Sequence, residues 1–199
     1  DLGVDVTRHQ ARSLSLELAA EVRLVDNALS SIASRYRARS FDGLAAANFA
    51  LYEMLHEQRA LIPFVTALRI TDSAGEVLIT PSEIDVPFSV AERAYFAQAR
   101  ETDRMVVSEP LISHSFGKWS IVLTRRLQAE GGQFQGIVYA IVAAEHFHQL
   151  FQRQSFGTSS AMAAVSSEGD CTNKSKNAVK KNSITPASSI CHWKAMASR

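Results

Sequence analysis

The chain has 199 residues, of which 46% are hydrophobic and 21% charged, and its formal net charge is +1. This length is enough for one domain with a sizeable core, and the composition is typical of a globular protein. A net charge so close to zero argues against electrostatic capture of nucleic acid or of an anionic membrane. The longest apolar stretch, Ile137 to Ala144, is far shorter than the roughly 20 residues of a membrane-spanning helix, and we expect it to form a buried strand.

Two helices are predicted at the start of the chain. Over residues 8–39, apolar side chains recur at spacings of three and four from Leu14 to Tyr36, which indicates one apolar helical face. A helix of about 30 residues is about 45 Å long, so we expect a stalk that extends beyond the domain or pairs with a second copy. The second helix is expected from about Leu44 to Leu61, before Pro63.

From Val65 the pattern changes to the two-residue alternation of strands. Two alternating runs around an Asp-x-x-Gly turn predict a β-hairpin. We expect an α+β fold in which the long N-terminal helix packs on a five-stranded antiparallel PAS-like sheet, while residues 81–118 cover the other face and enclose a pocket. The expected strands cover residues 66–71, 76–80, 105–108, 119–127 and 134–144, with short helices at 90–100 and from 145.

The tract around Arg93 is the strongest local signal of a binding site. Arg93 precedes Tyr95 and Phe96, and an arginine offers a fork of donors that suits a carboxylate, beside aromatic walls for a small ligand. Alternatively, the two rings are core anchors, and Arg93 pairs with Asp85 or Glu92.

Three further candidate positions lie in or near the fourth expected strand. Trp119 and Arg125 fall on the same strand face by the two-residue period. Trp119 either lines a pocket or closes the core. His114 precedes this strand in a loop, where it is either a pocket residue or an exposed loop histidine.

The order of these segments resembles the Cache superfamily of bacterial sensor domains, specifically the double-Cache type with PAS-like sheets. The resemblance covers about residues 10–155. Arg93-Ala94-Tyr95-Phe96 matches the family's R-x-[YW]-[YF] tract, and Ser108-Glu109-Pro110 matches its usual strand end. The resemblance implies an extracytoplasmic domain of a histidine kinase, diguanylate cyclase or chemoreceptor. Such a domain lies on the periplasmic side of the inner membrane and is membrane-anchored in the full-length protein.

The resemblance also implies a ligand between the sheet and the loop region. By position, Arg93, Tyr95 and Trp119 would line the pocket with Phe96 in support, and Arg125 and Tyr139 are added as candidates. In amino-acid-binding members, an aspartate on the last strand holds the ligand amine. Residues 136–144 contain no acid, so we expect a carboxylate or another small anion rather than an α-amino acid.

The chain is expected to divide into a helical stalk with the second helix (residues 1–62), a PAS-like sensor module (63–155), and a partial second module or weakly ordered tail (156–199). Cys171 and Cys191 both lie in the last part, either as a disulfide or as two free thiols. No metal-binding spacing or cofactor motif is found in the sequence.

Two functions remain open at this point. The first is a sensor domain that binds a small anionic ligand. The second is a dimerisation or partner-docking module without a ligand, which pairs as a homodimer through the helix of residues 8–39. An enzyme is disfavoured, because no acid, base and nucleophile can be assembled from recognisable motifs.

Overall fold

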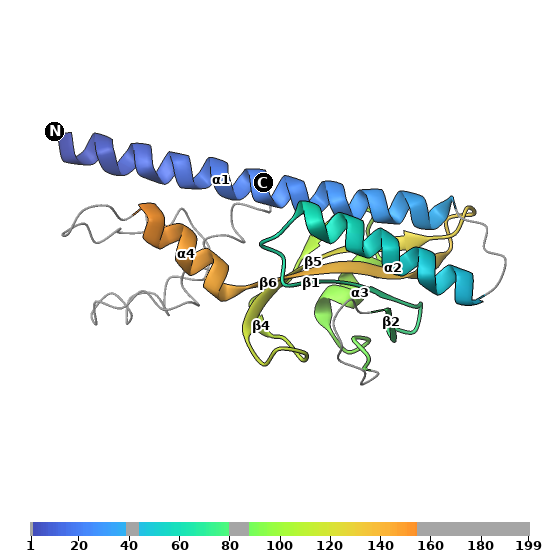
Figure 1. Cartoon of the computed structure of the whole chain (residues 1–199). Coiled ribbons are helices and arrows are strands. Elements are labelled where there is room, and N and C mark those ends of the chain that lie inside the picture. Colours follow the sequence, from blue (N-terminus) through green and yellow to red (C-terminus); the bar gives the residue numbers. More distant parts are fainter. Residues whose placement is uncertain (1, 39–43, 80–87, 155–199) are drawn as a thin grey trace.

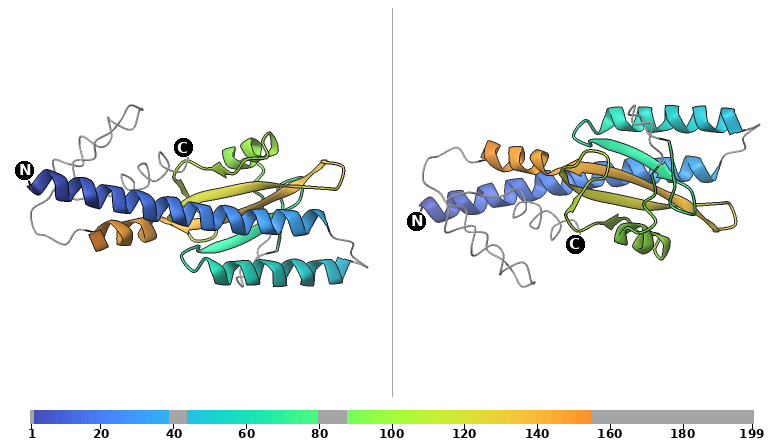
Figure 2. Two further views of the ribbon diagram at one scale, coloured as in Figure 1. Left: turned by 90° about the horizontal axis from the view of Figure 1, so that it is seen from above. Right: turned by 90° about the horizontal axis from the view of Figure 1, so that it is seen from below.

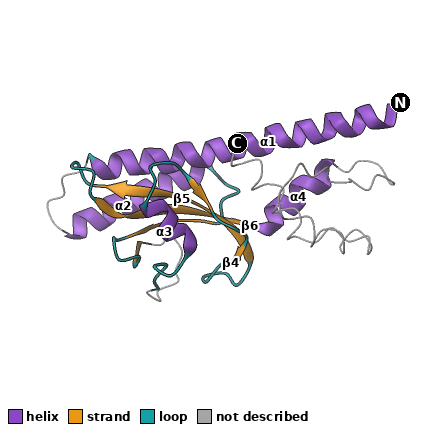
Figure 3. Ribbon diagram, turned by 180° about the vertical axis from the view of Figure 1, so that it is seen from behind, coloured by secondary structure: helices purple, strands orange, loops and turns teal. Residues whose placement is uncertain are grey.

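The computed structural model describes residues 2–38, 44–79 and 88–154 (Figure 1). Two helices lie on one face of a central antiparallel sheet, and a short helix with its loops lies on the other (Figure 3). The α+β fold predicted from the sequence is thereby confirmed. The elements, in chain order, are α1 (Leu2–Arg37), α2 (Leu44–Leu61), β1 (Ala67–Thr71), β2 (Val77–Ile79), α3 (Ala94–Arg100), β3 (Val106–Val107), β4 (Leu111–Ile112), β5 (Trp119–Gln128), β6 (Phe134–Ala143) and α4 (Ala144–Gln154).

Helix α1 is 36 residues long, which corresponds to about 54 Å. Its apolar face is fully buried against the sheet at Leu18, Leu29 and Ile32. The helix crosses the sheet and continues well beyond it, as expected for a stalk (Figure 1). Helix α2 runs back beside α1 on the same side of the sheet (Figure 2).

Helix α4 leaves the last strand and extends toward the same end of the molecule as the N-terminal half of α1 (Figure 2). The two helices are joined by His146 of α4, whose Nε2 lies 2.8 Å from a carboxylate oxygen of Glu21. The imidazole ring also stacks on Phe64, with 5.0 Å between the ring centroids. The helices that enter and leave the sheet are therefore in direct contact at one end of the molecule.

The sheet has the strand order β2-β1-β6-β5-β3, with β4 paired to the free part of β5. It contains six strands rather than the predicted five, because Leu111 and Ile112 form a two-residue strand that pairs with Ser120 and Trp119. The β1–β2 hairpin is present as predicted. At its turn, Asp72 Oδ1 accepts hydrogen bonds from two backbone amides, those of Ala74 and Glu76, both at 2.9 Å.

The short helix begins later than predicted, at Ala94 rather than residue 90. Arg93 is the N-cap residue and has an extended backbone, with φ −80° and ψ 133°. The predicted domain boundaries at 62 and 155 coincide with ends of regular elements but stay a prediction. Residues 156–199, including both cysteines, lie outside the described residues, as does Asp85.

Each central strand carries two different faces. On one face, Leu68, Ile121 and Val138 belong to the core beneath α1 and α2. On the other, Val122 and Tyr139 belong to a second core that includes the rings of α3. The sheet is therefore buried on both sides, and the residue number along a strand decides which layer a side chain enters.

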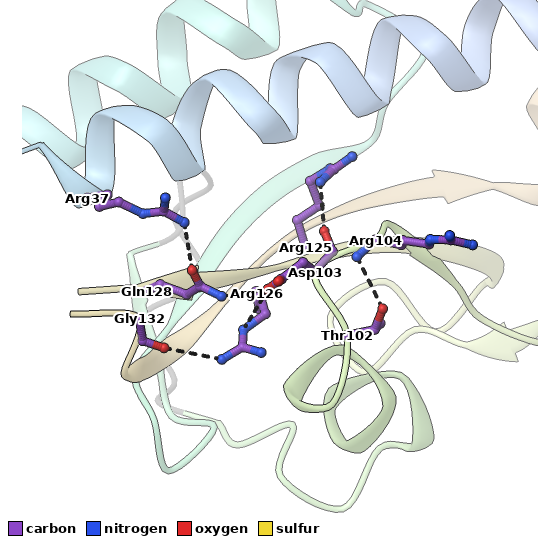
Figure 4. Close-up of polar contacts among 8 residues, drawn as sticks. All are labelled: Arg37, Thr102, Asp103, Arg104, Arg125, Arg126, Gln128 and Gly132. Atoms are coloured by element: carbon purple, nitrogen blue, oxygen red, sulfur yellow. Dashed lines mark hydrogen bonds and ion pairs between the residues drawn. The ribbon is translucent and has the colours of Figure 1, made fainter. Parts of the chain in front are cut away.

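Arg125 joins α1 to the sheet. Its Nε and Nη2 donate to the two carboxylate oxygens of Asp26, at 2.6 and 3.0 Å. Its Nη1 also donates to the backbone carbonyl of Asp103, at 3.0 Å. Figure 4 shows this arginine beside a second link, in which Arg37 of α1 donates to Gln128 at the end of β5, at 2.6 Å. These contacts hold the C-terminal half of α1 against β5.

We expect Arg125→Met to lower the free energy of unfolding by about 1–2 kcal/mol, between the values for exposed and buried ion pairs. The two side chains are 23% and 32% exposed, which weakens their attraction. Urea denaturation of Arg125→Met, Asp26→Asn and the double variant measures the coupling. Arg104→Met, at an exposed position on the neighbouring loop, is the charge-matched control. Additive effects of the two substitutions would show that the ion pair contributes nothing.

Candidate functional site

A small cavity lies between the face of the sheet opposite α1 and the segments around residues 88–95 and 111–115. Strands β1, β5 and β6 supply its floor through Arg69, Val122, Tyr139 and Ile141. The volume left between the side chains is about 10 Å³, which is about the space of one water position. Side chains around the cavity must therefore move before a larger molecule can enter.

Arg69 is the most unusual residue of this cavity. It lies in the middle of β1, where its neighbours Leu68 and Ile70 face the helices and Arg69 faces the cavity, opposite Tyr139 of β6. The residue is 0% exposed. Its guanidinium donates through Nη1 to Ser115 Oγ, and it lies 4.9 Å from the ring centroid of Phe88 and 5.5 Å from that of Phe116.

Several buried polar atoms of the cavity have no hydrogen-bond partner among the described residues. They are Nε and Nη2 of Arg69, the hydroxyl of Ser113 and the hydroxyl of Tyr139. Buried polar groups are paired in most native structures, so an unpaired cluster calls for an explanation. Within the part of the chain that the structure describes, no aspartate or glutamate lines the cavity. The site therefore combines positive charge with unpaired donors.

The two tyrosines of the site remain neutral well above neutral pH. Burial raises the pKa of Tyr139 to about 12, against which the charge of Arg69 and the approach of its guanidinium donors to the phenol act in the opposite direction. Burial, followed by the neighbouring Tyr139, also raises the pKa of Tyr95, while Arg93 and Arg69 oppose this rise. The ring centroids of the two tyrosines are 5.9 Å apart. Both phenols are thus retained as hydrogen-bond donors.

Four of the residues predicted from the sequence line this cavity: Arg93, Tyr95, His114 and Tyr139. They come from three separate segments of the chain, since Arg93 and Tyr95 both belong to the start of α3. Arg93 is half-buried at the start of α3, and His114 is exposed, with its ring 6.4 Å from that of Phe88. Their role in binding a ligand stays a prediction.

The other three predicted residues do not line the cavity. Arg125 lies on the helix side of β5 and binds Asp26 of α1. Trp119 lies on the same face of β5 as Arg125, pairs with Ile112 of β4 and is 47% exposed. Phe96 lies in the second core, where its ring packs edge-on against Phe134 at 5.8 Å. The two-residue period of β5 explains the first two positions, because Val122 is the cavity-facing residue.

Arg69, Ser113 and Ser115 are cavity residues that the sequence analysis missed. The signal for Arg69 was present, since it is the single charged residue in a strand whose five positions are all buried. For the two serines the sequence offers no such signal, because they lie in the loop between β4 and β5.

A second hollow, of about 400 Å³, lies on the surface between α1 and α2. Arg35 and Glu57 there pair with each other at 2.8 Å, and both are more than half exposed. None of the buried unpaired polar atoms found among the described residues lies in this hollow. It is larger than the cavity on the other side of the sheet but lacks the chemistry of a specific site.

No protein-family model matches the sequence, and no curated protein matches it. Solved structures do share the fold, and they are extracellular or ligand-binding domains of bacterial receptors. The chain therefore has the fold of Cache-type sensor domains, as the sequence motifs predicted. Among the described residues, no helix is long and apolar enough to cross a membrane.

The extracellular domain of rpHK1S-Z16, described as a histidine kinase, has a TM-score of 0.63 and 23% identity over 77% of this chain and 64% of that one. An extracellular ligand-binding receptor from Desulfohalobium retbaense has a TM-score of 0.63 and 16% identity, over 73% and 26%. The ligand-binding domain of the amino-acid chemoreceptor PctC from Pseudomonas aeruginosa, in complex with GABA, has a TM-score of 0.57 and 17% identity, over 73% and 65%. The chain spans less than two thirds of each of these chains.

We expect the Tyr139 phenol to ionise only near pH 12 in the folded protein. A pKa raised above the unfolded value of about 10 means that the native state holds this proton more tightly. The corresponding stability is present below about pH 10 and is lost as the pH rises toward 12. Tyrosinate absorbance during an alkaline titration should lose part of its late component in Tyr139→Phe, and Tyr95, whose pKa is also raised by burial, supplies the rest. Tyr52→Phe, at an exposed position outside the cavity, should retain the whole late component; an unchanged titration of Tyr139→Phe would contradict the prediction.

Proposed function

We propose that the chain is the extracytoplasmic sensor domain of a bacterial membrane receptor, such as a histidine kinase, diguanylate cyclase or chemoreceptor. It would lie on the periplasmic side of the inner membrane and recognise a small anion in the cavity opposite α1. The fold shared with receptor ligand-binding domains supports this class. A binding role is also supported against a catalytic one, because those similar structures are sensor and ligand-binding domains.

The charge of the cavity is the observation that supports an anionic ligand. Arg69 and Arg93 both line it, while its described lining contains no carboxylate. A ligand ammonium group would therefore lack an acidic partner there and would meet two cations instead. PctC was solved with GABA, and the Campylobacter jejuni chemoreceptor Tlp3 with L-valine, both of which carry an ammonium group. We infer a different ligand charge for this chain.

Signal transmission would use the sheet that the cavity shares with α1. The same strands, β5 and β6, present one face to the cavity and the other to α1. A ligand that binds better to one arrangement of the sheet and α1 than to another shifts the population between them. Because α4 contacts α1 through His146 and Glu21, both helices leading away from the sheet would respond together.

We expect a small anion to raise the melting temperature of the chain. A ligand at a hundred times its Kd stabilises the native state by about 2.7 kcal/mol, which corresponds to several degrees for a domain of this size. Differential scanning fluorimetry with carboxylates, phosphates and sulfonates measures the shift, and Arg93→Ala should reduce it. Arg104→Ala, which removes the same charge away from the cavity, is the control. A broad screen in which no anion changes the melting temperature would contradict the proposal.

The alternative function is a homodimerisation module without a ligand. It is favoured by the solvent-facing side of α1, where Leu16 and Leu24 are 60% and 49% exposed. Both residues lie within residues 8–39, the segment that was expected to pair. Apolar side chains on an exposed helical face are typical of a helix-pairing surface.

If α1 pairs with a second copy, Leu16→Glu together with Leu24→Glu should convert a dimer into a monomer in light scattering. The charged side chains would repel each other across a pairing surface. Ser34→Glu, at an exposed position nearer the C-terminal end of α1, tests whether any added acid has this effect. A monomer that still binds an anion would separate the sensor function from dimerisation, whereas a wild-type monomer would contradict pairing through α1.

A further inference from the structure

Two arginines of the chain present the same donor edge in different surroundings. Arg125 uses Nε and Nη2 to hold both oxygens of the Asp26 carboxylate, at 2.6 and 3.0 Å. These two nitrogens lie side by side on one edge of the guanidinium, which matches the spacing of two carboxylate oxygens. In Arg69 the same two nitrogens are buried and make no hydrogen bond of regular geometry among the described residues, although the guanidinium lies close to the Tyr139 hydroxyl. Arg69 therefore offers an unused copy of the edge that binds a carboxylate elsewhere in this protein.

The orientation of the Arg69 guanidinium is fixed on its remaining sides. Nη1 donates to Ser115 Oγ, and Phe88 and Phe116 lie within 4.9 and 5.5 Å of the guanidinium carbon. Neither a hydroxyl nor an aromatic ring neutralises the charge, and a buried unpaired ion costs several kcal/mol in practice. The open edge of Arg69 is thus preorganised, and a carboxylate arriving there would relieve an existing electrostatic cost.

The surroundings of this edge restrict what accompanies the carboxylate. The hydroxyls of Tyr139 and Ser113 are unpaired in the same cavity, and the other walls include the aliphatic side chains of Val90, Leu111 and Ile141. No described lining residue is acidic. Such walls suit a short apolar body with at most a hydroxyl or carbonyl oxygen, and they offer no partner to an ammonium group.

We propose that Arg69 is the specificity-determining residue of the site and binds one carboxylate side-on through Nε and Nη2, selecting a monocarboxylate whose body is apolar and carries no ammonium group. This inference rests on the proposed sensor function and adds the ligand class and its anchor. Arg93, which is half-buried at the start of α3, contributes a second charge to the same cavity.

The test uses the full chain and four carboxylates: acetate, propionate, butyrate and benzoate. Each is compared with its primary amide, which keeps the shape and removes the charge, and propionate is also compared with L-alanine, which adds an ammonium group. Titration calorimetry should show binding of at least one carboxylate, with at least about 30-fold weaker binding of its amide, as expected for losing a buried charged contact.

Arg69→Lys keeps the positive charge but removes the planar fork, and it should weaken carboxylate binding by about 30-fold as well. Arg104→Lys, on an exposed loop, is the matched control and should bind like the wild type. Three outcomes would each overturn the inference. The carboxylate could bind Arg69→Lys as tightly as the wild type, an amide could bind as tightly as its acid, or L-alanine could bind more tightly than propionate. Binding of phosphate or sulfonate alone would overturn it and leave the proposed sensing of anions standing.

A measurement without any ligand tests the premise that the charge is unpaired. Replacing Arg69 by Met, which is apolar and of similar length, should raise the melting temperature, since it removes an uncompensated buried ion. A marked decrease would mean that groups of the chain itself compensate the charge of Arg69; Glu83 and Asp85, which lie outside the described residues, would be replaced next by Gln and Asn. That result would overturn the inference without touching the class of protein proposed above.

Discussion

The alternation of side chains across a sheet that is covered on both faces is the constraint on which the rest of this structure depends. Because α1 and α2 bury one face and α3 with its loops buries the other, no central strand has a solvent-facing side. A shift of one residue in β1 would place Arg69 in the core beneath α1 and Leu68 in the cavity. The position of the charge therefore depends on register, which the pairing of β1 with β6 fixes.

Arg69 is the point at which this fold departs from the rules of stable cores. Buried cations are normally paired, yet here the described partners are a hydroxyl and two aromatic rings. Cation–π contacts contribute about 0.5–2 kcal/mol, less than the penalty for removing a guanidinium from water. The well-packed core beneath the helices must offset the difference. Local violations of this kind are concentrated at binding sites, because there the missing partner is a ligand.

Much of the fold could be predicted from the sequence, because long amphipathic patterns encode it directly. The apolar positions of α1 and the turn at Asp72 are local signals, and both were interpreted correctly. The two-residue strand β4 is too short to produce a pattern. The site was predicted less well, since Trp119 and Arg125 were correctly placed on one face of the strand but the sequence does not say which face borders the cavity. The odd number of Arg125 places it with Ile121 and Leu123 beneath α1, whereas Val122 faces the cavity. Arg69 was missed because its neighbours in space are distant in sequence.

Because the cavity is small, binding of a ligand requires movements that can reach α1. A space of about 10 Å³ holds no more than a water molecule, so binding of any organic anion requires a more open arrangement of the cavity walls. Phe88, Phe116 and His114 come from loops, whereas Tyr139 and Val122 come from strands whose opposite faces pack on α1. If only the loops move, α1 stays in place. If β5 or β6 moves, the close-packed interior transmits the displacement to α1, because Arg125 binds Asp26 there. The balance between loop and strand movement thus determines whether a ligand in the cavity displaces α1.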